Sequence, residues 1–91
     1  MNPNKTPYKL LHWPFIAAMA ENMRDGLTDD RQPGDWKGTP EKYHDEYWSA
    51  LIRHAVEFEQ TGDLKALAAV ACNSMILYGL KKDQGVKYEK I

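Results

Sequence analysis

The sequence predicts an all-α fold in which three main helices form an antiparallel bundle that oligomerisation completes. Three observations predict this fold. Apolar residues recur every three or four positions in three segments, turn-forming residues bound those segments, and 91 residues suffice for one domain with a modest core. We therefore treat residues 1–91 as a single helical domain.

The N-terminal third predicts an arm, one helix and a loop. Residues 1–12 contain two prolines and alternate polar with apolar side chains, so we expect an extended arm that lies across the domain. The segment PFIAAMAENMRDG predicts the first helix, with Pro14 in its first turn and Gly26 at its C-terminal cap. Residues 27–38 have no regular period and predict a loop that is long for a compact bundle.

The second helix has clear signals at both ends. Thr39 is a favourable N-cap, Pro40 suits the first helical position, and Gly62 suits the end of the helix. Between these signals one stripe of side chains recurs at helical spacing: Tyr43, Tyr47, Leu51, His54 and Phe58. We expect this helix to be the central one.

The third helix follows directly, with Asp63 as its predicted cap. Residues 64–80 are apolar on almost every side, which predicts a buried helix. Three helices of this length cannot cover so much apolar surface, so we expect a homo-oligomer in which helices pack between protomers. The charged residues 82–91, interrupted by Gly85, predict a C-terminal tail.

The composition excludes several classes of partner. A formal charge of −1 gives no general attraction for a nucleic acid polymer or an anionic membrane. The single cysteine, Cys72, excludes an internal disulfide and cysteine-rich zinc sites and suits a reducing compartment. We expect no membrane span, because the apolar runs stop short of about 18–20 residues, and no signal peptide. The expected location is the cytoplasm.

Two polar residues stand in apolar surroundings. Asn73 interrupts the run LAAVACNSMIL, and His54 shares the apolar stripe of the second helix. A buried amide without a partner costs about 1–3 kcal/mol, so Asn73 must be paired or used. A short turn near Gly62 would bring the two residues together, about one helical turn apart. They form either a satisfied core pair that fixes helix docking or the wall of a ligand cleft.

Four further residues complete the predicted ligand site. Arg53, next to His54, suits binding of an anion, and Tyr47 lies on the stripe of His54. Trp36 and Lys37, in the predicted loop, suit stacking on a base and contact with phosphate, although Trp36 equally suits a plug for the core. The predicted ligand-binding residues are therefore Trp36, Lys37, Tyr47, Arg53, His54 and Asn73.

The acidic residues do not predict a metal site within one chain. The second helix carries Glu41, Asp45, Glu46, Glu57 and Glu59, whereas the third helix carries no acid between Asp63 and residue 80. A cage for Mg²⁺ needs several oxygen ligands that converge on one ion. The three histidines are too scattered to predict a zinc site.

These residues resemble a known family. The order LLHWPFIAAMAENMRDG, a loop with a tryptophan, YWSALIRHAVEF, Gly62 and LAAVACNSMIL resembles the phage-borne domain described as the N-terminal domain of dATP/dGTP diphosphohydrolase. That domain is similar to the MazG-like all-α nucleotide pyrophosphatases. The resemblance covers most of residues 10–80, and ALIRH and AVACNSMIL are its most specific parts. It implies that Trp36, Arg53, His54 and Asn73 lie near a nucleotide pocket.

The chain departs from the family pattern at two places. Ala66 and Ala69 stand where members commonly carry histidine, and LTDDR stands where they carry a Lys-Tyr pair. These changes remove polar groups that metal-dependent hydrolysis would use, so we assign no catalytic residue and expect no cofactor.

Three hypotheses follow from the sequence. The first is a phage-type protein that binds a nucleotide, or a nucleotide-derived signal of bacterial defence, and sequesters it uncleaved in the host cytoplasm. The second is an Mg²⁺-dependent hydrolase that converts a nucleoside triphosphate to monophosphate and pyrophosphate. Its metal ligands would be Glu57, Glu59, Asp63 or the pair Asp45 and Glu46. The third is a protein-interaction module that uses the apolar third helix.

Overall fold

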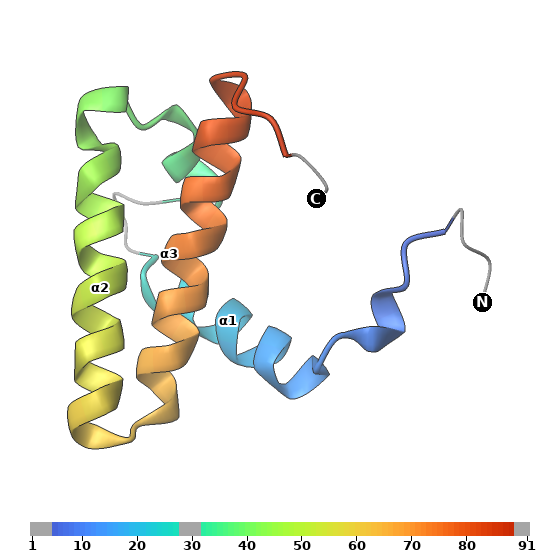
Figure 1. The fold of residues 1–91 in the computed structure, drawn as a ribbon, viewed down its shortest axis with the longest axis vertical. Coiled ribbons are helices and arrows are strands. Elements are labelled where there is room, and N and C mark those ends of the chain that lie inside the picture. Colours follow the sequence, from blue (N-terminus) through green and yellow to red (C-terminus); the bar gives the residue numbers. More distant parts are fainter. Residues whose placement is uncertain (1–4, 28–31, 89–91) are drawn as a thin grey trace.

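The computed structural model describes residues 5–27 and 32–88, and every regular element in these ranges is helical (Figure 1). The three α-helices are α1 (Trp13–Asp25), α2 (His44–Thr61) and α3 (Leu64–Asp83). Three short 3₁₀ turns accompany them: η1 (Tyr8–Leu10), η2 (Asp35–Gly38) and η3 (Glu41–Tyr43). The predicted all-α class is confirmed. Of the predicted tail, the structure places the first two residues in α3.

The helices α2 and α3 form an antiparallel hairpin with a tight connection (Figure 1). Gly62 ends α2 with a φ of 70°, and its N–H donates to the Phe58 carbonyl at 2.8 Å. Asp63 then caps α3, because its Oδ1 accepts from the Lys65 N–H at 2.9 Å. Both end signals predicted from the sequence are confirmed.

The start of α2 differs from the prediction. Pro40 is extended, with a ψ of 147°, and the turn η3 intervenes before α2 begins at His44. The Thr39 hydroxyl lies 3.3 Å from the Tyr47 hydroxyl and caps no helix. The predicted N-cap at Thr39 and first helical position at Pro40 were therefore wrong. The Thr39 hydroxyl contacts Tyr47 instead of a backbone N–H at the start of a helix.

The central helix is α3, not α2 as predicted. Both α1 and α2 pack on α3, and all the buried apolar side chains of the described residues belong to it. These are Ala66, Ala68, Ala69, Cys72, Ile76 and Leu80. In α2, only His44 is buried. The small side chains of α3 allow both neighbours to approach closely, which explains why this helix is in the middle.

The same helix is long and apolar enough to cross a membrane. Its 20 residues include an 18-residue window with a mean hydropathy of 1.2, so α3 meets this criterion by length and composition only, although Lys65 and Lys81 bound its uncharged run. The helix that forms the core of a soluble protein has the same composition, and α3 supplies the core here.

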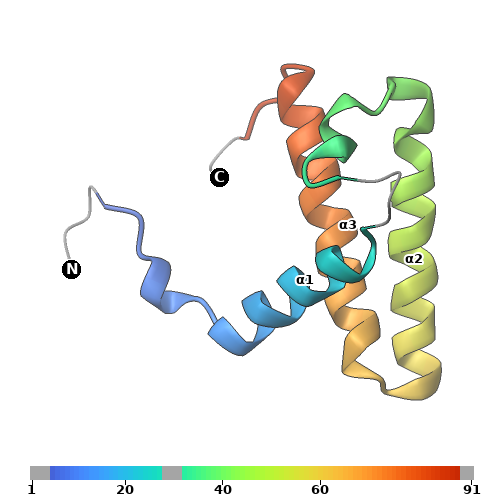
Figure 2. The ribbon, with the colours of Figure 1, turned by 180° about the vertical axis from the view of Figure 1, so that it is seen from behind.

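The helix α1 crosses α3 obliquely and does not run along the hairpin (Figures 1 and 2). The Cys72 thiol of α3 donates to the Met19 carbonyl of α1 at 3.2 Å. The N-terminal end of α1 lies far from the hairpin, so the described part of the arm, from Lys5, projects away from the helices (Figure 2). The expectation that the arm lies across the domain was wrong, and Leu10 is 74% exposed.

The hairpin thus has two different sides. On one side lie α1 and η2, which are in front of α3 in Figure 2. Cys72 and Gly79 point to this side, where they meet Met19 and Trp36. An α-helix turns by about 100° per residue, so the side chains of Leu77 and Lys81 point to the side of α3 opposite Cys72 and Gly79. We call these the α1 side and the open side.

Candidate functional site

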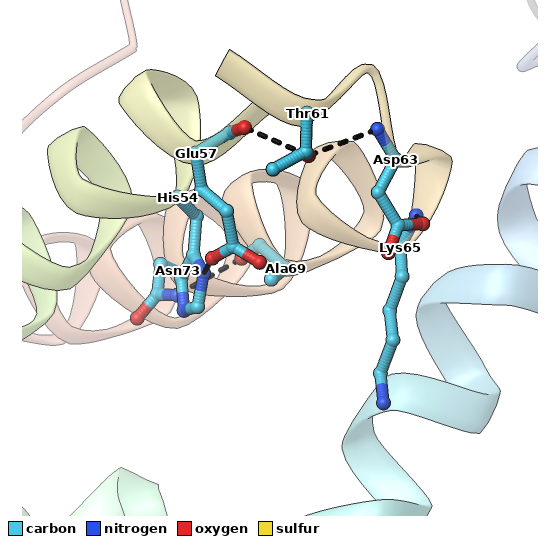
Figure 3. Close-up of polar contacts among 7 residues, drawn as sticks. All are labelled: His54, Glu57, Thr61, Asp63, Lys65, Ala69 and Asn73. Atoms are coloured by element: carbon cyan, nitrogen blue, oxygen red, sulfur yellow. Dashed lines mark hydrogen bonds and ion pairs between the residues drawn. The ribbon is translucent and has the colours of Figure 1, made fainter. Parts of the chain in front are cut away.

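The two polar residues singled out from the sequence project from the same side of the hairpin. His54 of α2 and Asn73 of α3 point out of the hairpin in the same direction, with Glu57 beside them and α1 nearby (Figure 3). His54 Nδ1 lies 3.2 Å from Glu57 Oε2, one turn further along α2. The hairpin therefore presents an imidazole, a carboxylate and a carboxamide on one side, and its register, in which His44 contacts Lys81, puts His54 and Asn73 at similar levels along the two helices.

The carboxamide of Asn73 is paired within its own helix. Its Nδ2 donates to the Ala69 carbonyl at 2.9 Å, so the cost of half-burying the amide is offset locally. This bond also fixes the amide orientation, with Oδ1 directed away from α3. Among the described residues, neither Asn73 Oδ1 nor His54 Nε2 has a hydrogen-bond partner. Both atoms are available to a ligand.

Trp36 and Lys37 lie on η2, on the same side of the hairpin. The indole of Trp36 is half-buried against α3, where it contacts Gly79. Lys37 Nζ lies 5.8 Å from the centre of this ring. One edge of the indole therefore packs against α3, as expected of a side chain that fills the core. Lys37 remains exposed.

Tyr47 and Arg53 have different surroundings. The Tyr47 hydroxyl contacts Thr39 and so ties the chain after η2 to α2. It lies two turns, about 10 Å, from His54 along the helix axis. Arg53 is exposed and points about 100° around α2 from His54, so the structure does not bring its guanidinium into the group.

The carboxylates do not converge. Within residues 5–27 and 32–88, no three side chains of His, Cys, Asp or Glu are placed to hold one metal ion. Glu57 is bonded to His54, and Asp63 caps α3 through Lys65 (Figure 3). The described residues of a single chain therefore do not fit an Mg²⁺ cage, and we derive no chemical step through this ion.

The structure shows one polar pair that sequence reasoning missed. His44 is buried, and both of its ring nitrogens are bonded: Nε2 donates to the Thr39 carbonyl and Nδ1 accepts from Lys81 Nζ, each at 3.1 Å. The partners are 37 residues apart, so no spacing rule links them. The available signal was that His44 lies one turn before Tyr47, but the stripe predicted from the sequence places Tyr43 there.

Two hollows lie on the open side. The smaller, of about 390 Å³, is lined by His44, Asp45, Trp48, Leu77 and Lys81. The larger, of about 860 Å³, shares Trp48, Leu77 and Lys81 and continues along Tyr78 to the chain after α3. Neither hollow is lined by any residue of the predicted ligand site.

Cys72 is a structural thiol. It is buried between α1 and α3, and burial raises the pKa of this thiol above its ordinary value of 9.0. A thiol that keeps its proton is a poor nucleophile. We therefore exclude Cys72 from the chemistry of the site.

Comparison with known proteins identifies the family. The sequence profile described as "dATP/dGTP diphosphohydrolase, N-terminal" matches residues 1–89, almost the whole chain. No curated protein and no solved structure matches significantly. The profile links the chain to nucleotide chemistry, and its extent covers α1, the hairpin and every residue of the predicted site. The chain belongs to the family of dATP/dGTP diphosphohydrolase N-terminal domains.

Proposed function

We propose that the chain binds a purine nucleotide on the α1 side of the hairpin and holds it without cleaving it. The observation that carries this proposal is the convergence of His54 and Asn73, each with one polar atom free of partners among the described residues. The family membership supplies the class of ligand.

The chemistry of the two side chains favours the donor edge of a purine. Glu57 holds His54 at Nδ1, which leaves Nε2 as an acceptor in the neutral ring. Asn73 Oδ1 is a second acceptor, because Nδ2 is bonded to Ala69. The exocyclic amine of adenine, or the ring N–H and amine of guanine, would donate to these atoms. Lys37 on η2 is the cation proposed to contact the phosphates.

The arrangement of the acidic residues supports sequestration rather than turnover. The carboxylates of the described chain do not form a cage for Mg²⁺, and Ala66 and Ala69 are buried in the core and have no polar side-chain atom. A protein of this kind would lower the free concentration of a nucleotide, or of a nucleotide-derived defence signal, by stoichiometric binding. We propose the cytoplasm of a phage-infected cell as the setting.

Titration with dATP and dGTP in the presence of a chelator tests the site. We expect His54→Ala and Asn73→Ala to weaken binding at least about tenfold each, the loss of about one good hydrogen bond. Gln60→Ala, an exposed polar residue near the end of α2, is the matched control and should bind like the parent chain. Equal affinity in all four proteins would contradict the site.

Hydrolysis is the second candidate, because the family is named for a diphosphohydrolase. Glu57, beside His54, is the acid best placed to contribute to it. Release of pyrophosphate from dATP or dGTP with Mg²⁺, abolished in Glu57→Gln, would establish hydrolysis and overturn sequestration.

A further inference from the structure

The larger hollow of the open side is lined by cations and aromatic rings. Its volume of about 860 Å³ lies within the range of about 300–1,000 Å³ that small-molecule sites occupy. Lys81, Lys82 and Lys87 line it, and no acidic residue does so among those that the structure describes. Its apolar wall includes Trp48, Leu77, Tyr78 and Tyr88. The hollow therefore presents positive charge next to flat apolar surface.

We propose that this hollow binds a small aromatic carboxylate, with the ring against Trp48 and the carboxylate among the three lysines. The aromatic wall accounts for the ring, and the lysines account for the negative charge. The hollow lies on the side of the hairpin opposite the proposed nucleotide site, so either proposal can fail without the other.

The ammonium group of Lys81 is held in place without losing its charge. Its Nζ donates to His44 Nδ1 at 3.1 Å and to Gln84 Oε1 at 3.4 Å. Both partners are uncharged, because Gln84 is an amide and His44 accepts at Nδ1 only as the neutral ring. An ammonium has three N–H donors, so one donor remains for an anion. Lys81 is therefore a positioned anchor for a carboxylate.

Lys82 and Lys87 add two charges to that of Lys81. The ion pairs of the described chain join other residues, so none of the three lysines is neutralised within it. A bound anion would relieve the repulsion between these like charges. The hollow also borders the C-terminal end of α3, where the helix dipole disfavours a doubly charged phosphate more than a singly charged carboxylate. The lysines and the dipole together favour a monoanion.

The chain after α3 forms one wall of the hollow because a Schellman motif turns it back. Gly85 has a φ of 89°, and its N–H donates to the Lys82 carbonyl at 2.9 Å. The Val86 N–H donates to the Lys81 carbonyl at 3.0 Å. The chain then runs back beside the last turns of α3 (Figure 1), which brings Val86 and Tyr88 to the hollow. Backbone hydrogen bonds therefore set the path of this wall.

The aromatic residues favour a flat ring and fix its orientation. Trp48 and Tyr78, from the two helices of the hairpin, both line the hollow. Aromatic rings pair more favourably than their buried area alone predicts. The adjoining smaller hollow, which shares Trp48 and Leu77, is lined by Asp45. The carboxylate of Asp45 repels the carboxylate of a ligand, so the charged end is directed to the lysines and the ring to Trp48.

Isothermal titration of the full chain with 2-naphthoate tests the proposal. The ligand controls are 2-naphthamide, which has a similar shape without the charge, and 2-naphthylmethylammonium, which carries the opposite charge. We expect saturable binding of 2-naphthoate that is at least about fivefold tighter than binding of 2-naphthamide, and no binding of the ammonium compound. The affinity for 2-naphthoate should fall as salt is added.

Two substitutions locate the binding in this hollow. Trp48→Ala and Lys81→Met should each weaken binding of 2-naphthoate at least about fivefold. Trp13→Ala is the control for the first, because both indoles are 55% exposed. Lys65→Met, at the other end of α3, is the control for the second. Both controls should bind like the parent chain.

Two further measurements decide the matter should Trp48→Ala or Lys81→Met fail to fold. The double variant Lys82→Gln with Lys87→Gln changes only exposed side chains and should weaken binding about fivefold. In the parent chain, 2-naphthoate should shift the amide NMR signals around Tyr78 and Lys82.

Four results would overturn the proposal. They are no saturable binding at about 1 mM 2-naphthoate, equal affinity for 2-naphthamide, unchanged affinity in the lysine double variant, and NMR shifts confined to His54 and Asn73. Displacement of 2-naphthoate by dGTP would also contradict a separate site, because it would assign this hollow to the nucleotide.

Discussion

The indole of Trp36 lies against the backbone of α3 at Gly79. A Cβ at position 79 would lie 2.6 Å from Trp36 Cη2 and 2.7 Å from Cζ3, closer than any real contact. Gly79 therefore permits η2 to dock on α3. That docking sets the positions of Lys37 and Thr39, and through Thr39 it is linked to Tyr47 and His44.

Gly79→Ala should destabilise the chain although alanine is the better helix former. The methyl group displaces the indole at a cost of about 1–3 kcal/mol, which outweighs the gain of about 1 kcal/mol in helix propensity. In a Trp36→Ala background the same substitution should stabilise the chain. Urea unfolding of the four proteins checks this reversal of sign, and a destabilising Gly79→Ala in both backgrounds would contradict the contact.

His44→Ala should cost about 2–3 kcal/mol of unfolding free energy. The substitution removes two hydrogen bonds and leaves the Thr39 carbonyl and Lys81 without this partner. His12→Ala, at an exposed histidine without a side-chain cap bond, should change stability by less than about 0.5 kcal/mol. Denaturant titration measures both, and similar small losses would show that the His44 pair is energetically unimportant.

Gly62→Ala should destabilise the hairpin by about 1–2 kcal/mol, because a residue with a Cβ is strained at a φ of 70°. Gly38→Ala is the matched control. A Cβ at position 38 meets open space and the backbone there has no positive φ, so stability should be unchanged or slightly higher. Thermal unfolding of both variants provides the comparison, and equal losses would refute a conformational origin.

Stability should fall in alkaline solution partly through Cys72. Burial raises the pKa of this thiol in the folded chain, so above pH 9.0 the unfolded chain releases the proton first. The contribution is therefore complete below pH 9.0 and is lost as pH rises toward the folded-state pKa. Cys72→Ala should show a shallower decline of unfolding free energy above that pH, and identical slopes would contradict it.

The sequence predicted the elements whose signals are local. The Gly62 and Asp63 ends and the Pro14 start depend on neighbours a few residues apart, and the short connection at Gly62 sets the register of His54 against Asn73. Trp36 was left between ligand stacking and core packing, because its partner Gly79 is 43 positions away and has no side chain to suggest a contact.

The differences from the predictions come from interactions and geometry that the local sequence pattern does not report. Thr39 is a good cap by composition, but Tyr47 takes its hydroxyl and the helix begins at His44. Arg53 is adjacent to His54 in sequence, yet helix geometry turns it away from the site. The arm was expected to lie across the domain because its prolines and alternating side chains predict an extended chain, but the oblique path of α1 carries it away (Figure 2).

Equilibrium dialysis of the chain against dGTP, with Mg²⁺ present and the nucleotide recovered and analysed afterwards, tests the central claim most directly. The account predicts saturable binding of one intact dGTP per site, weakened in Asn73→Ala and unaffected by chelation of Mg²⁺. Absence of saturable binding, or recovery of the nucleotide as dGMP and pyrophosphate, would contradict it.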